Sequence, residues 1–532
     1  MCRHGLQAKG GALALALALL SAPAASKAGG ATTAAPEGDG ARAAQLYASH
    51  CARCHGDGRL GGIGPALLPG NLRRLKPERA RAAIAKGLPA TQMPGFEAVL
   101  NTREIESLAS LIYTPPASVP TWGAAEIEAS HINHAGAHEP SATPVFDADP
   151  LNLFVVVESG DHHATILDGD ALEPIHRFKT RYALHGGPKF SPDGRFVYFA
   201  SRDGWITKFD LHALRPVAEI RAGINTRNLA VSSDGRYAMV ANYLPHTLVV
   251  LDARTLALLE IIEVGDGRGT TSRVSAVYDV PPRQSFVAAL KDLTEVWEIQ
   301  YSDEPEYYGR VHDYRIEGAP AVTERFPVRR IAIDDYLDDF FFDPGYRNLI
   351  GAARNARNGQ VVSLLVGRKI ADVELPGLPH LGSGISWVHD GRPVVATPNL
   401  KDGVVSVIDL KTWKTVRRID TLGPGFFMLS HENTPYAWVD VFFGPDRDAV
   451  HVVDKRTLEI VTTLRPAPGK IAAHVEFTRD GRYALLSIWD HDGAIVIYDA
   501  ATLKEVKRIP MNKPSGKYNV YNKISGSAGT SH

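Results

Sequence analysis

The chain has 532 residues, and its 58 Lys and Arg against 59 Asp and Glu give a formal net charge of −1. With 44% hydrophobic and 22% charged residues, its composition is that of an ordinary globular protein. This argues against a nucleic-acid-binding protein, a polybasic membrane anchor and a disordered chain. Glycine (48) and proline (35) are frequent, as in folds of many short strands and turns, whereas three cysteines are too few for a disulfide scaffold.

Residues 1–28 have the pattern of a removable signal peptide. A positively charged start is followed by the Ala/Leu run 11–20 and by Ala22-Pro23-Ala24, which resembles a cleavage site. The alternative is an uncleaved anchor, but the apolar run has about 10 residues and a membrane span needs about 20. No other apolar run reaches that length. We therefore expect an exported protein of the periplasm with no membrane span.

The sequence Cys51-Ala52-Arg53-Cys54-His55 predicts covalent attachment of one c-type haem. On a helix, positions i, i+3 and i+4 share a face, so both sulfurs and the imidazole of His55 can meet one flat macrocycle. His55 is then expected to be an axial iron ligand. The alternatives are a zinc half-site and a thioredoxin-like redox pair. Zinc would need more ligands, and the adjoining histidine argues against simple redox exchange.

Met93 is the predicted second axial ligand of this haem. It is the only methionine between Met1 and Met239, and it lies in a loop with proline and glycine beside it. A thioether is a usual partner of histidine in cytochromes c, although a methionine can also simply fill a core. With helical patterns before the cysteines and over 102–112, residues 40–117 are predicted to form a small α-helical cytochrome c domain.

From residue 145 onward the chain repeats itself. Asp-Gly-Arg turns at 193–195, 234–236 and 480–482 each lie between apolar segments, and an alternating apolar strand that ends on an acid follows. Starts are mostly about 41–50 residues apart, a period typical of propeller blades with four strands each. Residues 145–532 are therefore predicted to be mainly β, an eight-bladed β-propeller. Five weaker copies begin near Asp147, Pro281, Asp343, Val388 and Glu432.

The repeat register brings several polar residues to one place. If the strand before each Asp-Gly turn is an inner one, then its first residues line a mouth of the central channel. His185, Asn228, His380 and His474 stand at such positions in different repeats. A single histidine is usually a hydrogen-bonded structural residue. Three at similar positions favour a shared axial pocket.

These segments carry a family resemblance. The stretch Tyr182–His185, the turn at 193–195 and Ser201–Gly204 resemble the cytochrome cd1 nitrite reductases, as do Leu378–Gly382 and Gly516–Asn522. The resemblance covers nearly the whole mature chain and implies a cytochrome c domain followed by an eight-bladed propeller that binds haem d1 non-covalently. Within that family the chain is most similar to the dihydro-haem d1 dehydrogenases of haem d1 biosynthesis.

The resemblance also implies iron ligands. His185 matches the proximal ligand of the d1 iron, and His380 matches a distal histidine that would ligate iron in the bound complex. Where the nitrite reductases have a second distal histidine, this chain has Asp338. Two imidazoles can donate hydrogen bonds to nitrite, whereas a carboxylate tends to repel it. This difference argues against nitrite reduction.

The implied reaction is oxidation of one propionate of dihydro-haem d1 to an acrylate, with loss of two protons and two electrons. The resemblance puts His474 and Tyr518 near the reacting side chain. A positioned base is needed, and an imidazole can take a proton near neutral pH, so His474 is the expected base and Tyr518 its orienting or relaying partner. Four arginines in or beside the mouth segments suit the carboxylates of the macrocycle, although any one is more often a solvated surface residue: Arg181, Arg202, Arg227 and Arg273.

Electrons would leave one at a time through haem c to an acceptor that the sequence does not name. The product would pass to a cytochrome cd1 nitrite reductase. Two other functions remain open: a nitrite reductase with haem d1 as its permanent cofactor, and a non-catalytic haem d1 carrier.

Overall fold

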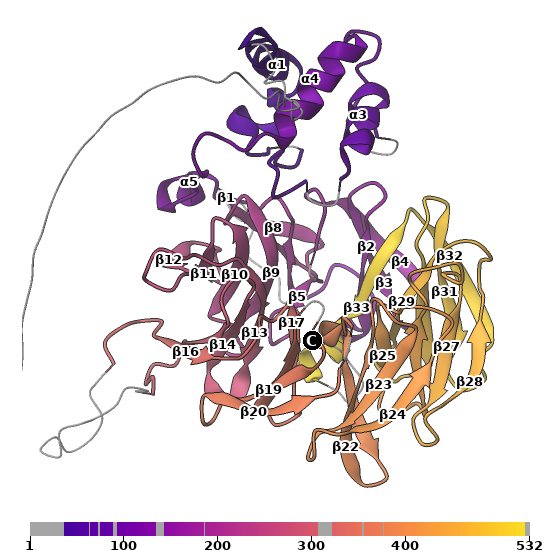
Figure 1. The fold of residues 1–532 in the computed structure, drawn as a ribbon. Helices are drawn as coiled ribbons and strands as arrows, with labels where there is room; N and C mark the ends of the chain where they lie inside the picture. Colours follow the sequence, from indigo (N-terminus) through magenta and orange to yellow (C-terminus); the bar gives the residue numbers. More distant parts are fainter. Residues whose placement is uncertain are drawn as a thin grey trace, which may run out of the picture.

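The computed structural model describes residues 37–526, apart from 63, 73–74, 89–92, 135–142, 186, 307–321, 354–355 and 376. A small helical domain lies above a large ring of strands (Figure 1). The expected signal peptide, residues 1–28, lies outside the described residues. Within the described part, no helix is long and apolar enough to cross a membrane.

The helical domain consists of short helices around a small apolar core. Helix α4 begins with a capping box, in which the Asn101 side chain accepts from the Glu104 amide (3.0 Å) and Glu104 accepts from the Asn101 amide (3.1 Å). Leu46, Ile84 and Leu108 bring α1, α3 and α4 together. The helices before the cysteines and over 102–112 were predicted, whereas α3 was not. The elements are α1 (Glu37–His50), α2 (Ala52–His55), η1 (Asp57–Arg59), α3 (Pro77–Lys86) and α4 (Thr102–Tyr113).

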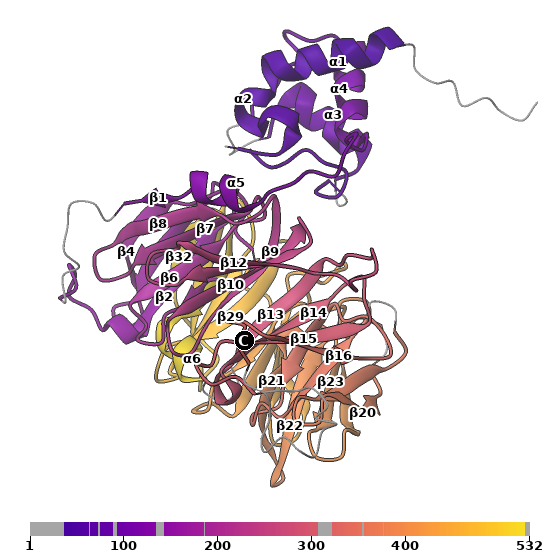
Figure 2. The ribbon, with the colours of Figure 1, turned by 90° about the vertical axis from the view of Figure 1, so that its left-hand side faces the viewer.

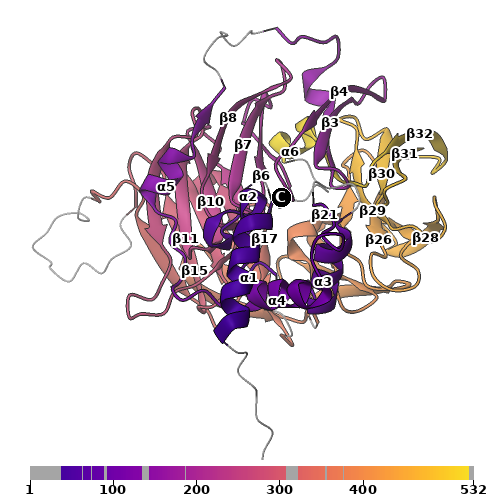
Figure 3. The ribbon, with the colours of Figure 1, turned by 90° about the horizontal axis from the view of Figure 1, so that it is seen from above.

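Eight antiparallel sheets form the ring, which confirms the predicted eight-bladed propeller (Figure 3). From the channel outward, the first four blades are β33 (Pro514–Asn519), β2 (Leu153–Glu158), β3 (His163–Asp168) and β4 (Glu173–Lys179); β5 (Lys189–Phe190), β6 (Phe196–Ala200), β7 (Trp205–Asp210) and β8 (Arg215–Arg221); β9 (Asn225–Val231), β10 (Tyr237–Leu244), β11 (Thr247–Asp252) and β12 (Leu258–Glu263); β13 (Val274–Val280), β14 (Ser285–Leu290), β15 (Glu295–Gln300) and β16 (Val328–Ala332). The other four are β17 (Asp339–Phe342), β18 (Asn348–Ala352), β19 (Gly359–Ser363) and β20 (Arg368–Val373); β21 (Ile385–His389), β22 (Arg392–Pro398), β23 (Val404–Asp409) and β24 (Thr415–Asp420); β25 (Met428–Ser430), β26 (Tyr436–Asp440), β27 (Val450–Asp454) and β28 (Glu459–Leu464); β29 (Ala472–Phe477), β30 (Tyr483–Ile488), β31 (Gly493–Asp499) and β32 (Glu505–Met511). Short helical turns are η2 (Pro150–Asn152), η3 (Pro281–Arg283) and η4 (Leu381–Ser383).

The turns of the repeat lie where the sequence predicts them. Asp193-Gly194 joins β5 to β6, Asp234-Gly235 joins β9 to β10, and Asp480-Gly481 joins β29 to β30. Each turn therefore follows the innermost strand of its blade, as predicted. The glycines have φ near +72°, a conformation that residues with a Cβ rarely adopt.

Both ends of the propeller segment meet in one blade. The last strand, β33, pairs with β2, so that Tyr518 lies opposite Val155 and Lys517 opposite Val156. Helix α6 (Val520–Ser525) follows and packs on η2 and β5. Ring closure thus depends on a segment from the carboxyl end of the chain.

The connection from the helical domain also enters the propeller. Its helix α5 (Ala124–Ala129) buries Ile127 among side chains of two blades. Its short strand β1 (Ile132–Asn133) adds a fifth strand to the second blade, with Ile132 opposite Glu219 of β8 (Figure 2). The connection was not predicted to contain structure, because both elements are too short for a periodic pattern.

Candidate functional site

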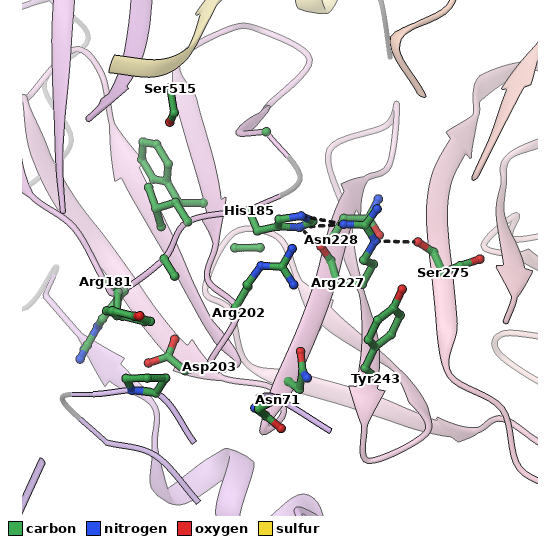
Figure 4. A pocket seen from close by; sticks show the side chains of 18 of the residues that line it. Asn71, Arg181, His185, Arg202, Asp203, Arg227, Asn228, Tyr243, Ser275 and Ser515 are labelled. Atoms are coloured by element: carbon green, nitrogen blue, oxygen red, sulfur yellow. Dashed lines mark hydrogen bonds between the residues drawn. The ribbon is translucent and has the colours of Figure 1, made fainter. Parts of the chain in front are cut away.

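A cavity of about 2870 Å³ lies between the helical domain and the inner strands of the propeller, and residues of both line it. A pocket for one drug-sized ligand has about 300–1,000 Å³, so this cavity has room for more than one macrocycle. In Figure 4, His185, Arg202 and Arg227 turn toward the same space, with Asn71 of the helical domain at its lower edge. Every residue that the sequence singled out for haem binding or catalysis lines this one cavity: Cys51, Cys54, His55, Met93, Arg181, His185, Arg202, Arg227, Arg273, His380, His474 and Tyr518.

The helical side of the cavity has the donors for a covalent haem. Cys51 and Cys54 are free and half-buried, and α2 carries His55 one residue after the second thiol. The His55 Nδ1 donates to the Pro65 carbonyl (2.8 Å), which leaves Nε2 for an iron. Burial lowers the pKa of His55, so the imidazole stays neutral as a ligand must. Met93 lines the same cavity. These residues fit a haem c.

These cysteines do not form a zinc site with other described residues. Within the part of the chain that the structure describes, no group of three or more His, Cys, Asp or Glu side chains is arranged to hold a metal ion. Burial also raises the pKa of Cys51 to about 11, which disfavours the thiolate that zinc or redox exchange would use.

His185 lies just before β5 and is held by Arg227. Its Nδ1 donates to the Arg227 carbonyl (2.7 Å), and the Arg227 guanidinium lies 2.6 Å from its Nε2. Arg227 also donates from Nε to the Ser275 carbonyl (3.1 Å). Nε2 is the atom that would ligate iron, so ligation requires the guanidinium to move away from it.

His380 lies in another blade, immediately before η4. Its Nδ1 donates to the Phe426 carbonyl (2.6 Å), and its ring packs against the ring of Phe426 with centroids 4.3 Å apart at 31°. Burial lowers the pKa of His380, so the imidazole is neutral. With Nδ1 engaged by a carbonyl, Nε2 is the remaining ligand atom.

His474 and Tyr518 come from adjacent inner strands, β29 and β33. Their rings meet edge to face, with centroids 5.0 Å apart at 69°. Burial, helped by the charges of Lys517 and Lys523, lowers the pKa of His474 well below its usual value. The expectation of an imidazole that titrates near neutral pH is therefore wrong for the free protein. Burial raises the pKa of Tyr518, so its phenol remains a hydrogen-bond donor.

The four arginines differ in how they are engaged. Arg181 makes two hydrogen bonds to Glu219 (2.8 and 2.7 Å), and Arg273 donates from Nε to Asp292 (2.8 Å). Carboxylates therefore already offset the charges of these two. Arg227 bonds to a carbonyl and an imidazole, which are neutral groups, so its charge remains available to an anionic ligand.

Asp338, which the resemblance matches to a distal histidine, lines the cavity and forms an ion pair with Lys291. Its neighbour Asp339 accepts from the Tyr278 hydroxyl (2.9 Å) and from the Gly382 amide (3.1 Å) in the loop that carries His380. Lys291 could not be predicted from the sequence, because a lysine after a strand has no spacing signal.

Comparison with known proteins gives a consistent result. The family model "Cytochrome D1 heme domain" matches residues 148–317 and 320–523, and "Cytochrome C oxidase, cbb3-type, subunit III" matches 38–112. The chain is 59% identical over 488 residues to a dihydro-heme d1 dehydrogenase of Pseudomonas aeruginosa, covering 92% of this chain and 95% of that protein. It is 26% identical over 536 residues to a nitrite reductase of Stutzerimonas stutzeri, covering 90% and 92%. A solved structure, dihydro-heme d1 dehydrogenase NirN in complex with DHE, superposes with a TM-score of 0.84 at 57% identity, covering 91% of this chain and 100% of that one.

Proposed function

We propose that this chain, which belongs to the cytochrome d1 haem-domain family, is a dihydro-haem d1 dehydrogenase. The observation that carries this conclusion is the 59% identity to such an enzyme over nearly the whole of both proteins. The substrate's CH₂–CH₂ unit loses two protons and two electrons and becomes the CH=CH of an acrylate. Haem c, when bound, would accept electrons one at a time. A separate electron acceptor must remove both electrons over the cycle.

The propeller residues bind and orient the substrate. His185 and His380 come from the second and sixth blades and both line the cavity, so they can approach the substrate iron from different sides. Arg227 leaves the imidazole of His185 and pairs with a substrate carboxylate. A guanidinium fork suits a carboxylate because it can donate two parallel hydrogen bonds. Arg202 is a second cation of this wall.

His474 is the proposed base that takes a proton from the propionate side chain. Its pKa is low in the free protein because burial and two lysines disfavour the imidazolium. The bound macrocycle brings several carboxylates into the cavity, and nearby negative charge raises the pKa of an imidazole. Substrate binding therefore makes His474 a better base. Tyr518 holds the ring of His474 edge-on and keeps it directed at the substrate.

The Asp338–Lys291 ion pair supports a dehydrogenase over a nitrite reductase. It replaces an imidazole that would donate to nitrite with a carboxylate that is already paired. We further propose that the protein works in the periplasm of a denitrifying cell and delivers its product to a cytochrome cd1 nitrite reductase.

Anaerobic mixing of the haem c-containing protein with dihydro-haem d1 tests the proposal. We expect the absorbance of haem d1 to appear together with reduction of haem c. Binding without conversion would support a carrier instead. Turnover of added nitrite with an electron donor would support a nitrite reductase.

A further inference from the structure

We infer that Asp440 and Lys517 are positioning residues that hold His474 from the two sides of its backbone. The inference rests on the proposed function, because it assigns Asp440 and Lys517 the role of keeping the proposed base in position. Neither side chain lines the cavity, and both are almost fully buried, with 1% and 0% of their surfaces exposed. They therefore act on the reaction only through His474 and its neighbours.

The backbone of His474 needs such support. Its φ is +56°, in the left-handed region that residues with a Cβ rarely adopt. It is the unpaired residue of a β-bulge, because the register of β29 against β30 shifts between Ala473 and Val475. A bulge redirects a side chain out of the alternation of a strand. Here Ala473 and Val475 are buried, and His474 lines the cavity.

Asp440, at the end of β26, connects His474 to the His380 side of the cavity. Its Oδ2 accepts from the His474 amide (3.2 Å), and its Oδ1 accepts from the amides of Phe426 (2.7 Å) and Phe427 (3.1 Å). The carbonyl of that same Phe426 accepts from Nδ1 of His380. One buried carboxylate therefore fixes the bulge that carries the proposed base and the segment that orients a proposed iron ligand.

Lys517 holds the other side of the same residue. Its ammonium donates to the His474 carbonyl from β33, the strand that also carries Tyr518. Burying a polar group without a hydrogen bond is costly, and these two side chains satisfy the peptide N–H and C=O groups that the bulge leaves without a strand partner. Neither residue needs to move a proton for this role.

Two substitutions test the roles of Lys517 and Asp440 separately. Lys517→Met removes the donor to the carbonyl of His474 but does not touch the Phe426 segment. Asp440→Asn weakens both connections, because the oxygen of a neutral amide is a poorer acceptor than a carboxylate oxygen and the other end of the amide is a donor that must face an N–H. Asp409→Asn is the matched control, since Asp409 is 3% exposed and accepts from two amides, Lys411 (2.8 Å) and Thr412 (2.9 Å), at a turn away from the cavity.

For Lys517→Met we expect wild-type affinity and absorption bands of bound dihydro-haem d1, with conversion slowed by about 10²-fold at saturating substrate, the effect of a displacement of about 1 Å. For Asp440→Asn we expect the same loss and, in addition, shifted bands of the bound substrate. Asp409→Asn should leave both unchanged. Crystal structures of the variants should show residue 474 outside the left-handed region or its ring turned from the cavity.

Conversion within about threefold of wild type by both variants would overturn the inference, because a base displaced by about 1 Å should lose far more than threefold in rate. An unchanged residue 474 in both crystal structures would also overturn it. If either variant does not fold, the other carries the test, because each substitution removes a separate hydrogen bond to the backbone of His474. If the wild-type protein binds but does not convert dihydro-haem d1, the proposed function fails, whereas the crystal structures still decide whether the two side chains hold His474.

Discussion

The substitution His474→Ala should separate binding of the substrate from its oxidation. The iron ligands proposed for binding, His185 and His380, are held by the carbonyls of Arg227 and Phe426 and do not depend on the imidazole of His474. The Nδ1 atom of His474 is buried and has no hydrogen-bond partner among the described residues, so its loss leaves no polar group there unpaired. We therefore expect binding to remain.

Conversion should fall by roughly 10² to 10⁴, the usual contribution of a positioned acid or base. This corresponds to about 3–6 kcal/mol of barrier at about 1.4 kcal/mol per tenfold change in rate. The upper part of the range is the better expectation, because His474 is 6% exposed and water has little access to replace it as a base.

Tyr518→Phe is the companion variant. The phenyl ring keeps the edge-to-face contact with His474 and loses only the hydroxyl, so the rate should fall less than in His474→Ala. If phenol and imidazole act as one relay, then each single substitution and the double substitution should cost about the same. Anaerobic stopped-flow mixing with dihydro-haem d1 measures both product formation and haem c reduction. Wild-type conversion by His474→Ala would end its assignment as the base, and loss of binding alone would make it a substrate-holding residue.

Four further predictions concern the haem c, the propeller ligand, the pH dependence and the distal side. Met93→Ala should lower the reduction potential of haem c in a redox titration, since a thioether ligand raises it; an unchanged spectrum and potential would remove Met93 from the ligand set. His185→Ala should weaken or spectrally shift bound dihydro-haem d1 and leave haem c unchanged, whereas wild-type titration curves and bands would reject the ligation. Because the pKa of His474 is lowered in the free protein, its basic form persists as pH falls, so kcat/KM for conversion should hold through pH 6.5 and decline only below it; a decline centred at 6.5 would contradict the burial argument. Asp338→His should give little nitrite turnover, because Lys291 and the rest of the pocket remain; robust turnover would show that this one residue decides the reaction.

Much of the fold could be predicted from local patterns. Where a repeat has an Asp-Gly turn, the turn gives the position of the inner strand, because an inner strand, a tight turn and a second strand are contiguous in sequence. The same register brought His185, His380 and His474 to one cavity. The C-x-x-C-H motif likewise fixes two thiols and one imidazole on a single helical turn.

What could not be predicted depends on contacts between distant segments. Asp440 and Lys517 meet His474 from other blades, and neither stands in a motif with it. The low pKa of His474 results from burial and from lysines of β33 and α6, which the sequence of β29 does not contain. The hydrogen bond between Arg227 and His185 likewise joins two blades.

Because β33 pairs with β2, the first blade is complete only when residues 514–519 have been synthesised. A copy that stops before Pro514 lacks the strand that completes the first blade, and it also lacks Lys517 and Tyr518. Such a copy exposes the unpaired edge of β2, whose side chains are buried in the complete protein, and an exposed apolar strand edge invites aggregation or proteolysis. Truncated chains would therefore lack two residues proposed to act in the reaction and would also be prone to degradation, so a cell would not accumulate copies that capture the macrocycle without converting it.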